Sequence, residues 1–146
     1  MLHSVLDLSE TQVRAVMVPR TNMVALPAEI AREELLQVVV EAGYSRVPIF
    51  QGSVDSIIGI LHLKDLLREL QAGNRDFFDL KALLRPVYYV PESMKINVLL
   101  REFQRRKTHI AVVVDEYGGT AGIVTLEDII EEIVGEIQDE YDVEEK

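Results

Sequence analysis

The chain has 146 residues, with 25 Asp and Glu against 15 Lys and Arg, a formal net charge of −10 and a hydrophobic fraction of 48%. These values are typical of a folded chain of one domain, or of two very small ones that share a core, and no run approaches the roughly 20 apolar residues of a membrane-spanning helix. The excess of acidic residues, without a basic stripe, argues against a nucleic-acid partner. We expect no signal peptide. The lack of cysteine excludes disulfides, thiol catalysis and thiolate metal sites.

Two stretches of the chain repeat the same pattern. Residues 59–67 (GILHLKDLL) match residues 122–130 (GIVTLEDII) at an offset of 63, and residues 45–50 match residues 108–113 at the same offset. Elsewhere the offset is 64 or 67, which indicates small insertions or deletions in loops. A duplication of this length predicts two copies of one structural unit.

The predicted elements begin with a helical lead-in over residues 2–11 and then follow the same order in both copies. Helices are predicted where apolar residues recur every three or four positions, and strands where short apolar runs are bounded by polar or glycine-rich turns. The elements of the first copy are a strand ending at Pro27, a helix over 33–42, strands over 47–50 and 57–61 and a helix over 63–72. Those of the second copy are a strand ending at Pro91, a helix over 98–106, strands over 110–114 and 120–124 and a helix over 126–137.

Each copy is therefore β-α-β-β-α and spans roughly 55 to 60 residues, which is marginal for an independent fold. The nearly continuous apolar strands imply sheets that are covered on both faces or pressed against the other copy. We predict an α/β (α+β) fold in which the two copies form one module. The expected divisions are a helical lead-in over 1–12, the first copy over 13–73, a linker over 74–79, the second copy over 80–137 and an acidic tail over 138–146.

The start of the last helix of the second copy carries the most informative motif. Thr125 ends a buried strand, and Asp128 lies three residues on, in the first turn of the following helix. The Asp128 carboxylate can accept hydrogen bonds from both hydroxyls of a ribose, and the Thr125 hydroxyl and the free N–H groups of the helix start can meet phosphate or sugar oxygens. The alternative is a capping box, which any helix start needs and which contributes about 1 kcal/mol. The first copy keeps the aspartate (Asp65) but has His62 in place of the threonine, which favours a ligand role for the aspartates.

The repeated motif and the SRVPIF and THIAVV strands before it resemble a cystathionine-β-synthase (CBS) domain pair, or Bateman module. More narrowly, the segments VMVPRTNMVAL, AGYSRVPIF, GILHLKDLL, DEYGGTAGIVTLEDIIEEIVGEI and QDEYD resemble the CBS pair of the CorC/HlyC-like and CNNM magnesium and cobalt efflux proteins. The resemblance covers residues 6–142. It implies tandem CBS domains that pack with pseudo-twofold symmetry, a homodimer shaped as a flat disc, and a sensor of adenine nucleotides in place of an enzyme.

The resemblance also implies a nucleotide cleft for AMP, ADP or ATP at the second-copy motif. Thr125 and Asp128 would contact the ribose and the first phosphate, and Arg46 and His109, at matched positions before the second strands, would face phosphates. Ser45 belongs to the same implied nucleotide-binding set. The purine would lie near Val18, Val24, Tyr44, Val47, Pro48 and Ile123. This composition suits the ligand, because a purine needs an apolar slot with an aromatic face and phosphates need Arg or protonated His.

A second, weaker site is implied in the first copy. It would use His62, Asp65 and Ile110, together with residues near 84–90. His62 replaces the small hydroxyl residue and fills volume, so we expect weaker binding there, or an empty site.

The negative charge is concentrated at the end of the chain, where residues 127–146 hold ten carboxylates and one lysine. The default interpretation is a solvated helix face that keeps the module soluble. Two others stay open: the tail could bind Mg²⁺ through carboxylates, or it could couple the module to another domain. The weak metal candidates are Glu131, Glu132, Glu136 and Asp139.

The predicted function is a cytoplasmic regulatory module that binds an adenine nucleotide, with or without Mg²⁺, in a magnesium or cobalt efflux protein at the cell membrane. The resemblance implies a membrane domain before the module and a transporter-associated domain after it. The main rival is a purely structural dimerisation module whose clefts are filled by side chains. An enzyme is a poor third, because the sequence has no cysteine, only three histidines and no base–nucleophile constellation.

Overall fold

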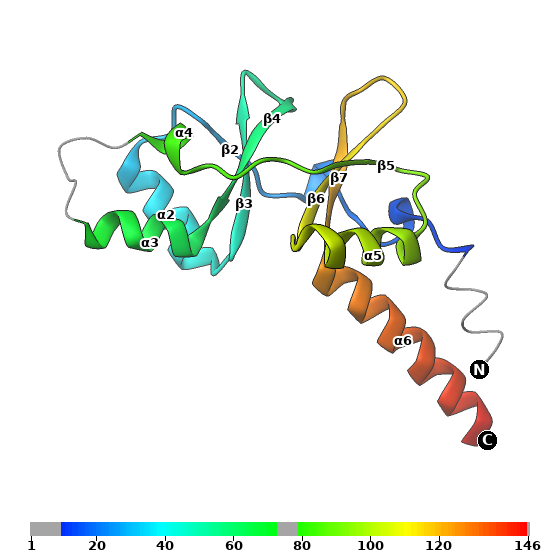
Figure 1. Ribbon diagram of the computed structural model, residues 1–146. Helices are drawn as coiled ribbons and strands as arrows, with labels where there is room; N and C mark the ends of the chain where they lie inside the picture. The colour runs from blue at the N-terminus through cyan, green and yellow to red at the C-terminus, as the bar shows by residue number, and fades with distance from the viewer. Residues whose placement is uncertain (1–9, 73–78, 146) are drawn as a thin grey trace. The chain divides into compact units, whose positions relative to one another are not determined.

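The computed structural model describes residues 10–72 and 79–145, and along the last helix it describes side chains through Gly135 and at Ile137. The chain divides into two compact units. The continuous unit comprises residues 24–87, and the discontinuous unit combines residues 10–23 with residues 88–145. Both contain a sheet and helices, which confirms the predicted mixed α/β fold class (Figure 1).

The continuous unit contains a three-stranded sheet in the order β2-β3-β4. Its elements are the strands β2 (Leu26–Pro27), β3 (Arg46–Gln51) and β4 (Ser53–His62) and the helices α2 (Arg32–Ala42), α3 (Leu63–Gln71) and α4 (Leu80–Leu83). β2 runs parallel to β3, and β3 and β4 form an antiparallel hairpin. Leu35 and Val39, four residues apart on α2, pack into one core with Ile49 of β3, so the helical period buries one face of α2.

The discontinuous unit contains a four-stranded sheet in the order β1-β7-β6-β5. Its elements are the strands β1 (Val18–Pro19), β5 (Tyr89–Pro91), β6 (Ile110–Val114) and β7 (Thr120–Thr125), the helices α5 (Ile96–Arg106) and α6 (Leu126–Glu145), and the 3-10 helices η1 (Val13–Ala15) and η2 (Arg20–Asn22). β1 pairs antiparallel with β7, so a segment from the start of the chain completes the sheet of the second copy. The structural units therefore do not coincide with the two halves of the sequence repeat.

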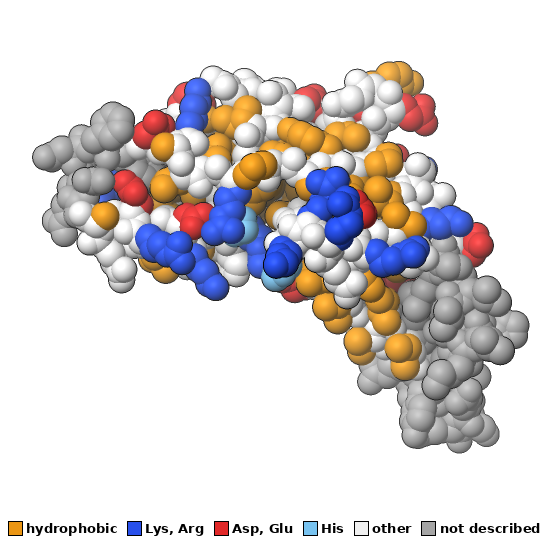
Figure 2. Space-filling model, in the orientation of Figure 1, with side chains coloured by type: hydrophobic (Ala, Val, Ile, Leu, Met, Phe, Trp, Pro, Cys, Tyr) orange, Lys and Arg blue, Asp and Glu red, His pale blue; other side chains and the backbone are white. Residues whose placement is uncertain are grey.

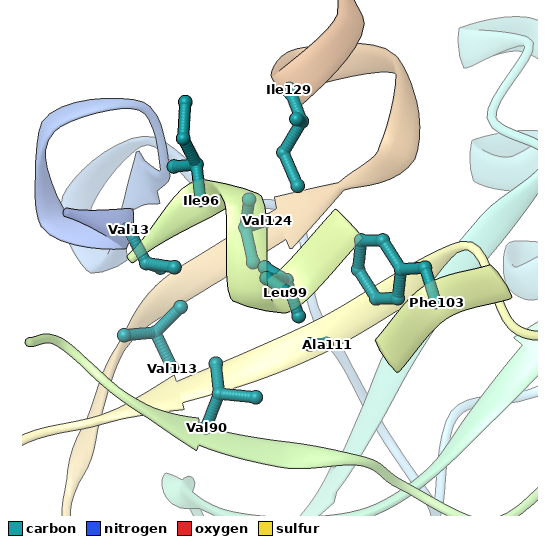
Figure 3. Close-up of a cluster of buried hydrophobic side chains, with 9 residues drawn as sticks. All are labelled: Val13, Val90, Ile96, Leu99, Phe103, Ala111, Val113, Val124 and Ile129. Carbon is teal, nitrogen blue, oxygen red and sulfur yellow. The ribbon is translucent and has the colours of Figure 1, made fainter. Parts of the chain in front are cut away.

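Figure 3 shows the core of the discontinuous unit, where side chains from η1, the sheet and both long helices meet. The buried members are Val13, Val90, Ile96, Leu99, Phe103, Ala111, Val113, Val124 and Ile129. Ala111 and Val113 alternate along β6, which places one face of the strand against the helices. Phe103 of α5 is only 1% exposed, and its ring meets that of Tyr88 edge-on with centroids 6.4 Å apart.

A glycine stands in each hairpin where a neighbouring segment crosses closely. A Cβ at Gly122 of β7 would collide with the carbonyl oxygen of Val18 in β1. A Cβ at Gly59, the equivalent position in β4, would lie 2.6 Å from the Cβ of Leu84. Both positions need glycine for close approach, but the obstacle at Gly122 is backbone and the obstacle at Gly59 is a side chain.

The first strands of the two hairpins, β3 and β6, are equivalent at an offset of 64 in the structure, one residue more than the offset of 63 in the sequence match. Arg46 pairs with His62 in the first copy, and Ile110 pairs with Thr125 in the second. Because His62 and Thr125 occupy equivalent positions, Arg46 corresponds to Ile110, and the prediction that Arg46 and His109 are matched was wrong. The first hairpin has one residue more than the second, and two register shifts near the end of β3 absorb it.

The other predicted elements are present, and the differences lie at their ends. α6 continues past its predicted end at Ile137 through Glu145, because no proline or glycine follows Gly135 to stop it. β4 begins at Ser53, four residues before its predicted start, and extends the hairpin. Most of the predicted lead-in over 2–11, and all of the predicted linker over 74–79 except Asp79, lie outside the described residues.

Candidate functional site

The junction of β7 and α6 forms the centre of the candidate site. β7 ends at Thr125, and α6 begins with the next residue. The backbone N–H of Asp128 donates to Oγ1 of Thr125 at 3.1 Å, and the backbone N–H of Thr125 donates to Oδ2 of Asp128 at 3.1 Å. This reciprocal pair is a capping box, so the capping interpretation of Thr125 and Asp128 is confirmed.

The capping box leaves hydrogen-bonding capacity at both residues. The Thr125 hydroxyl accepts the capping bond and keeps its own hydrogen to donate. Asp128 accepts through Oδ2, and no other group of the described residues pairs with its carboxylate. Both residues are half-buried, which strengthens polar contacts without closing the site to a ligand. The junction can therefore accept hydroxyl donors and donate to an oxygen while the cap stays intact.

An apolar strip lies on the same face of the sheet, beside Thr125. Val18 of β1 and Ile123 of β7 are direct cross-strand partners, so their side chains project to the same face. Ile123 and Thr125 are two residues apart on β7 and share that face, whereas Val124 points into the core. Val18 and Ile123 are half-buried, and they offer a surface on which a flat apolar group can lie.

His109 also lies at this junction, and its structural counterpart in the first copy is Ser45. The His109 carbonyl accepts the N–H of Leu126 at 2.8 Å, and the Ser45 carbonyl accepts the N–H of Leu63 at 2.9 Å. Each therefore holds the first residue of the following helix through its backbone. The side chains of Ser45 and His109 are exposed, so both remain accessible to a ligand.

The other predicted nucleotide contacts belong to the continuous unit: Val24, Tyr44, Ser45, Arg46, Val47 and Pro48. Tyr44 is 42% exposed and Arg46 is half-buried, so both side chains are accessible. Val47 is 1% exposed and packs in the core, so its side chain is not accessible to a ligand. The contact of these residues with Thr125 and Asp128 stays a prediction.

The equivalent junction in the first copy has a different arrangement. His62 is the N-cap of α3, but its side chain makes no capping hydrogen bond. The Asp65 carboxylate instead accepts two hydrogen bonds from Arg85, Nε to Oδ2 at 2.9 Å and Nη2 to Oδ1 at 3.1 Å. The hydrogen bonds from Arg85 hold the pKa of Asp65 below its ordinary value, against the opposing effect of burial. Both oxygens of Asp65 are thus bound to one guanidinium.

Sequence reasoning placed residues near 84–90 at the first-copy site but gave Arg85 no role of its own. Its backbone is fixed on β4, because the Arg85 N–H donates to the Ile60 carbonyl at 2.9 Å and the Ile60 N–H donates to the Arg85 carbonyl at 3.0 Å. Ile60 corresponds to Ile123 in the repeat, so Arg85 corresponds to Val18, the partner of Ile123. The signal in the sequence was this match at an offset of 67, with an arginine in one copy and a valine in the other. Ile110, the other predicted member of the first-copy site, is only 3% exposed.

The predicted metal candidates fall partly outside the described side chains. Glu131 is exposed and Glu132 is half-buried, whereas the side chains of Glu136 and Asp139 are not described. Within the described part of the chain, no three His, Asp or Glu side chains are grouped so that they could hold a metal ion. A magnesium site in the tail therefore stays a prediction.

None of the helices in the described residues combines the length and the apolar composition required to cross a membrane.

The family model for the CBS domain matches the chain twice, over residues 13–72 and 79–135. The magnesium and cobalt efflux protein CorC of Pasteurella multocida is 43% identical over 145 residues, which cover 99% of this chain and 48% of that protein. The chain thus spans about half the length of this curated relative.

Two solved structures extend the comparison. The CBS domain of a bacterial CNNM/CorC family Mg²⁺ transporter in complex with ATP is 50% identical, with a TM-score of 0.80 and coverage of 92% of this chain and 94% of that one. A CBS-domain pair with bound AMP from Klebsiella pneumoniae is 31% identical, with a TM-score of 0.75 and coverage of 85% and 98%. With two family matches along the chain and these relatives, the chain belongs to the CBS domain family, as a CBS-domain pair of the CNNM/CorC kind.

Proposed function

We propose that this CBS-domain pair is a regulatory, non-catalytic module that binds AMP, ADP or ATP at Thr125 and Asp128, with or without Mg²⁺. The observation that carries the proposal is the half-buried Asp128 carboxylate, which has no cationic partner among the described residues and is hydrogen-bonded to Thr125, beside the apolar pair Val18 and Ile123. A ribose offers two hydroxyl donors to such a carboxylate, and a purine offers a flat apolar face to such a strip. The relatives solved with ATP and with AMP support the same class of ligand.

α6 is the proposed route from the nucleotide to the rest of the parent protein. It starts at the site and continues for 20 residues to Glu145, so a movement of its first turn is carried along the whole helix. We infer a parent at the cytoplasmic side of the cell membrane that exports Mg²⁺ or Co²⁺, with a membrane domain before the module and a transporter-associated domain after it. The efflux name of the curated relative supports this assignment. Nucleotide that binds one arrangement of the module more tightly would then bias the attached domain.

Asp128→Ala is expected to weaken nucleotide binding about tenfold or more, because two hydrogen bonds to the ribose, each worth roughly 1 kcal/mol, are lost. Thr125→Val removes the hydroxyl at nearly constant volume, and we expect a smaller loss of affinity. Isothermal titration calorimetry with AMP and with Mg-ATP, side by side, measures both effects.

Both substitutions also remove a helix cap, which is worth about 1 kcal/mol, so thermal unfolding is measured in parallel. Glu116→Gln, in the turn between β6 and β7, makes the same charge change at an exposed position and is the matched control. If Asp128→Ala lowered the melting temperature but left the nucleotide affinity unchanged, Thr125 and Asp128 would serve only as a helix cap. A ligand at ~100 times its dissociation constant adds about 2.7 kcal/mol of stability, so the absence of both heat and thermal stabilisation with millimolar nucleotide would refute the proposal.

A purely structural dimerisation module is the second candidate, and an exposed apolar stripe on α6 favours it. Ile130, Val134 and Ile137 recur at helical spacing and are 48%, 54% and 55% exposed. Figure 2 shows hydrophobic side chains along the first part of α6. Leu67 on α3, which corresponds to Ile130 in the repeat, is 45% exposed. We propose that a second copy of the chain covers these faces in a homodimer, which is compatible with nucleotide binding at Asp128.

Val134→Lys is expected to convert the homodimer into a monomer at micromolar concentration, because it places a charge in the apolar stripe. The substitution suits an isolated α6, since the introduced ammonium group would follow Glu131 by three residues and attract its carboxylate. Sedimentation velocity measures the mass in solution. Tyr117→Ser is the control, because Tyr117 is 93% exposed at the tip of the β6–β7 hairpin, outside the stripe. An unchanged dimer in Val134→Lys would show that the stripe is not the interface.

A further inference from the structure

The two aspartates of the repeat occupy equivalent positions but have different partners. Asp128 accepts a hydrogen bond from its own helix cap, and no cation of the described residues pairs with it. Asp65 is held on both oxygens by Arg85, and Arg68 adds a longer contact of 3.9 Å. The same carboxylate is thus available in one copy and occupied in the other.

The difference originates at one position of the segment that crosses each hairpin. Val18 and Arg85 are both paired with the isoleucine that lies two residues before the end of the second hairpin strand, Ile123 in one copy and Ile60 in the other. A long basic side chain at this position reaches the first turn of the following helix, as the 2.9 Å bond to Asp65 demonstrates. Valine at the same position carries no charge and no donor.

We propose that Arg85 withholds Asp65 from nucleotide, whereas Val18 leaves Asp128 available, so that the pair binds one adenine nucleotide per chain. This inference rests on the proposed function, since it assumes that the aspartate receives the ribose. It makes Arg85 a specificity-determining residue for the choice between the two copies.

The chemistry of the Arg85–Asp65 pair supports this role. A bidentate guanidinium–carboxylate pair is charge-assisted at both bonds, and such bonds are roughly twice as strong as neutral ones. To bind Asp65, two ribose hydroxyls would have to displace both hydrogen bonds from Arg85, and the hydroxyls would replace the charged donor only with neutral donors. The Arg85 side chain is 51% exposed, and exposed ion pairs are usually weak, but this pair has the favourable bidentate geometry and the Asp65 side chain is only 16% exposed.

Exchanging the two side chains tests the proposal. Arg85→Val places the second-copy residue in the first copy and is expected to raise the stoichiometry from one to two nucleotides per chain, by titration with AMP and with Mg-ATP. Arg85→Gln is a second variant that removes the charge and keeps a polar surface. Arg85→Lys retains the charge, so its stoichiometry is expected to stay at one nucleotide per chain. In the Arg85→Val background, Asp65→Ala should remove the added site, whereas Asp65→Ala alone should leave binding unchanged.

Val18→Arg is the reciprocal change, and it should weaken binding at Asp128 about tenfold or more, which corresponds to about 1.4 kcal/mol. Val18→Leu controls for added bulk. A stoichiometry that stays at one in Arg85→Val and Arg85→Gln, with wild-type affinity, overturns the inference and leaves the proposed function intact. Weaker binding in both variants also overturns it, because Arg85 would then contact the ligand itself.

The two ideas can also fail in the opposite order. A wild-type chain that binds no nucleotide, beside an Arg85→Val chain that binds one and loses it with Asp65→Ala, would support the role of Arg85 and refute binding at Asp128. No binding in either chain refutes both.

Discussion

Gly122→Ala should destabilise the discontinuous unit by about 3 kcal/mol, at the upper end of the usual cost of forcing extra atoms into a packed site. The added Cβ would meet the Val18 carbonyl oxygen, and a backbone oxygen held in the β1–β7 pairing cannot rotate away as a side chain can. The expected response is a shift of β1 away from β7. Because Val18 supplies part of the apolar strip beside Thr125, nucleotide affinity should fall together with stability.

Two further glycines calibrate this expectation in the same urea-denaturation series. Gly135→Ala has no atom within 4 Å of the new Cβ and lies inside α6, so it should stabilise the chain by roughly 0.5 to 1 kcal/mol. Gly59→Ala meets the Leu84 side chain, which can move, and its cost should lie between the other two. Equal midpoints for Gly122→Ala and the wild type would mean that β1 does not cross β7 as closely as described.

The elements of this fold were predictable because each carries a local pattern. Leu35 and Val39 are spaced for one face of a helix, and Ala111 and Val113 alternate for one face of a strand; all four are buried as these spacings require. The capping box was visible for the same reason, since its two residues are three positions apart. Repetition strengthened these predictions, because each pattern occurs twice along the chain.

Distant pairings were not predictable, because nothing local encodes them. β1 has only two residues, and its partner β7 lies more than 100 positions further along the chain, so the crossing at Gly122 has no periodic signal. The same limit applies to the Arg85–Asp65 pair, whose members are 20 residues apart. The one-residue error in matching Arg46 to His109 has a physical cause as well, because register shifts in the first hairpin absorb a residue that an ungapped alignment cannot place.

The candidate site was therefore predicted in its local part and left open in its distant part. Thr125 and Asp128 lie where the motif placed them, at the start of α6. Val47 was predicted to contact the purine, but the alternation of side chains along β3 places its side chain in the core. The inequality of the two copies depends on Arg85, whose proximity to Asp65 only the folded chain reveals.

Phe103→Ala should have the largest effect on stability, about 3 to 5 kcal/mol of the free energy of unfolding. Phe103 is 1% exposed and belongs to the core in Figure 3, and its loss would leave a cavity and remove the edge-on contact with Tyr88. Tyr88 also supports the guanidinium of Arg106, which lies 4.0 Å from the ring centroid, so this second contact should loosen too. A loss of this size is a large part of the roughly 5 to 15 kcal/mol that stabilises a typical domain.

The same substitution links the core to the proposed site, because Ile129 packs in this core and follows Asp128 directly on α6. Phe103→Ala should therefore weaken nucleotide binding without touching any proposed contact, whereas Phe103→Leu, which keeps most of the volume, should cost less than about 1.5 kcal/mol and leave affinity near the wild-type value. Urea denaturation measures the first effect, and calorimetric titration with AMP under conditions where both variants stay folded measures the second. Wild-type affinity in a folded but strongly destabilised Phe103→Ala chain would show that the first turn of α6 is held by its cap and by β7 alone. Such a result would place the transmission of a nucleotide signal beyond the core, in the later turns of α6.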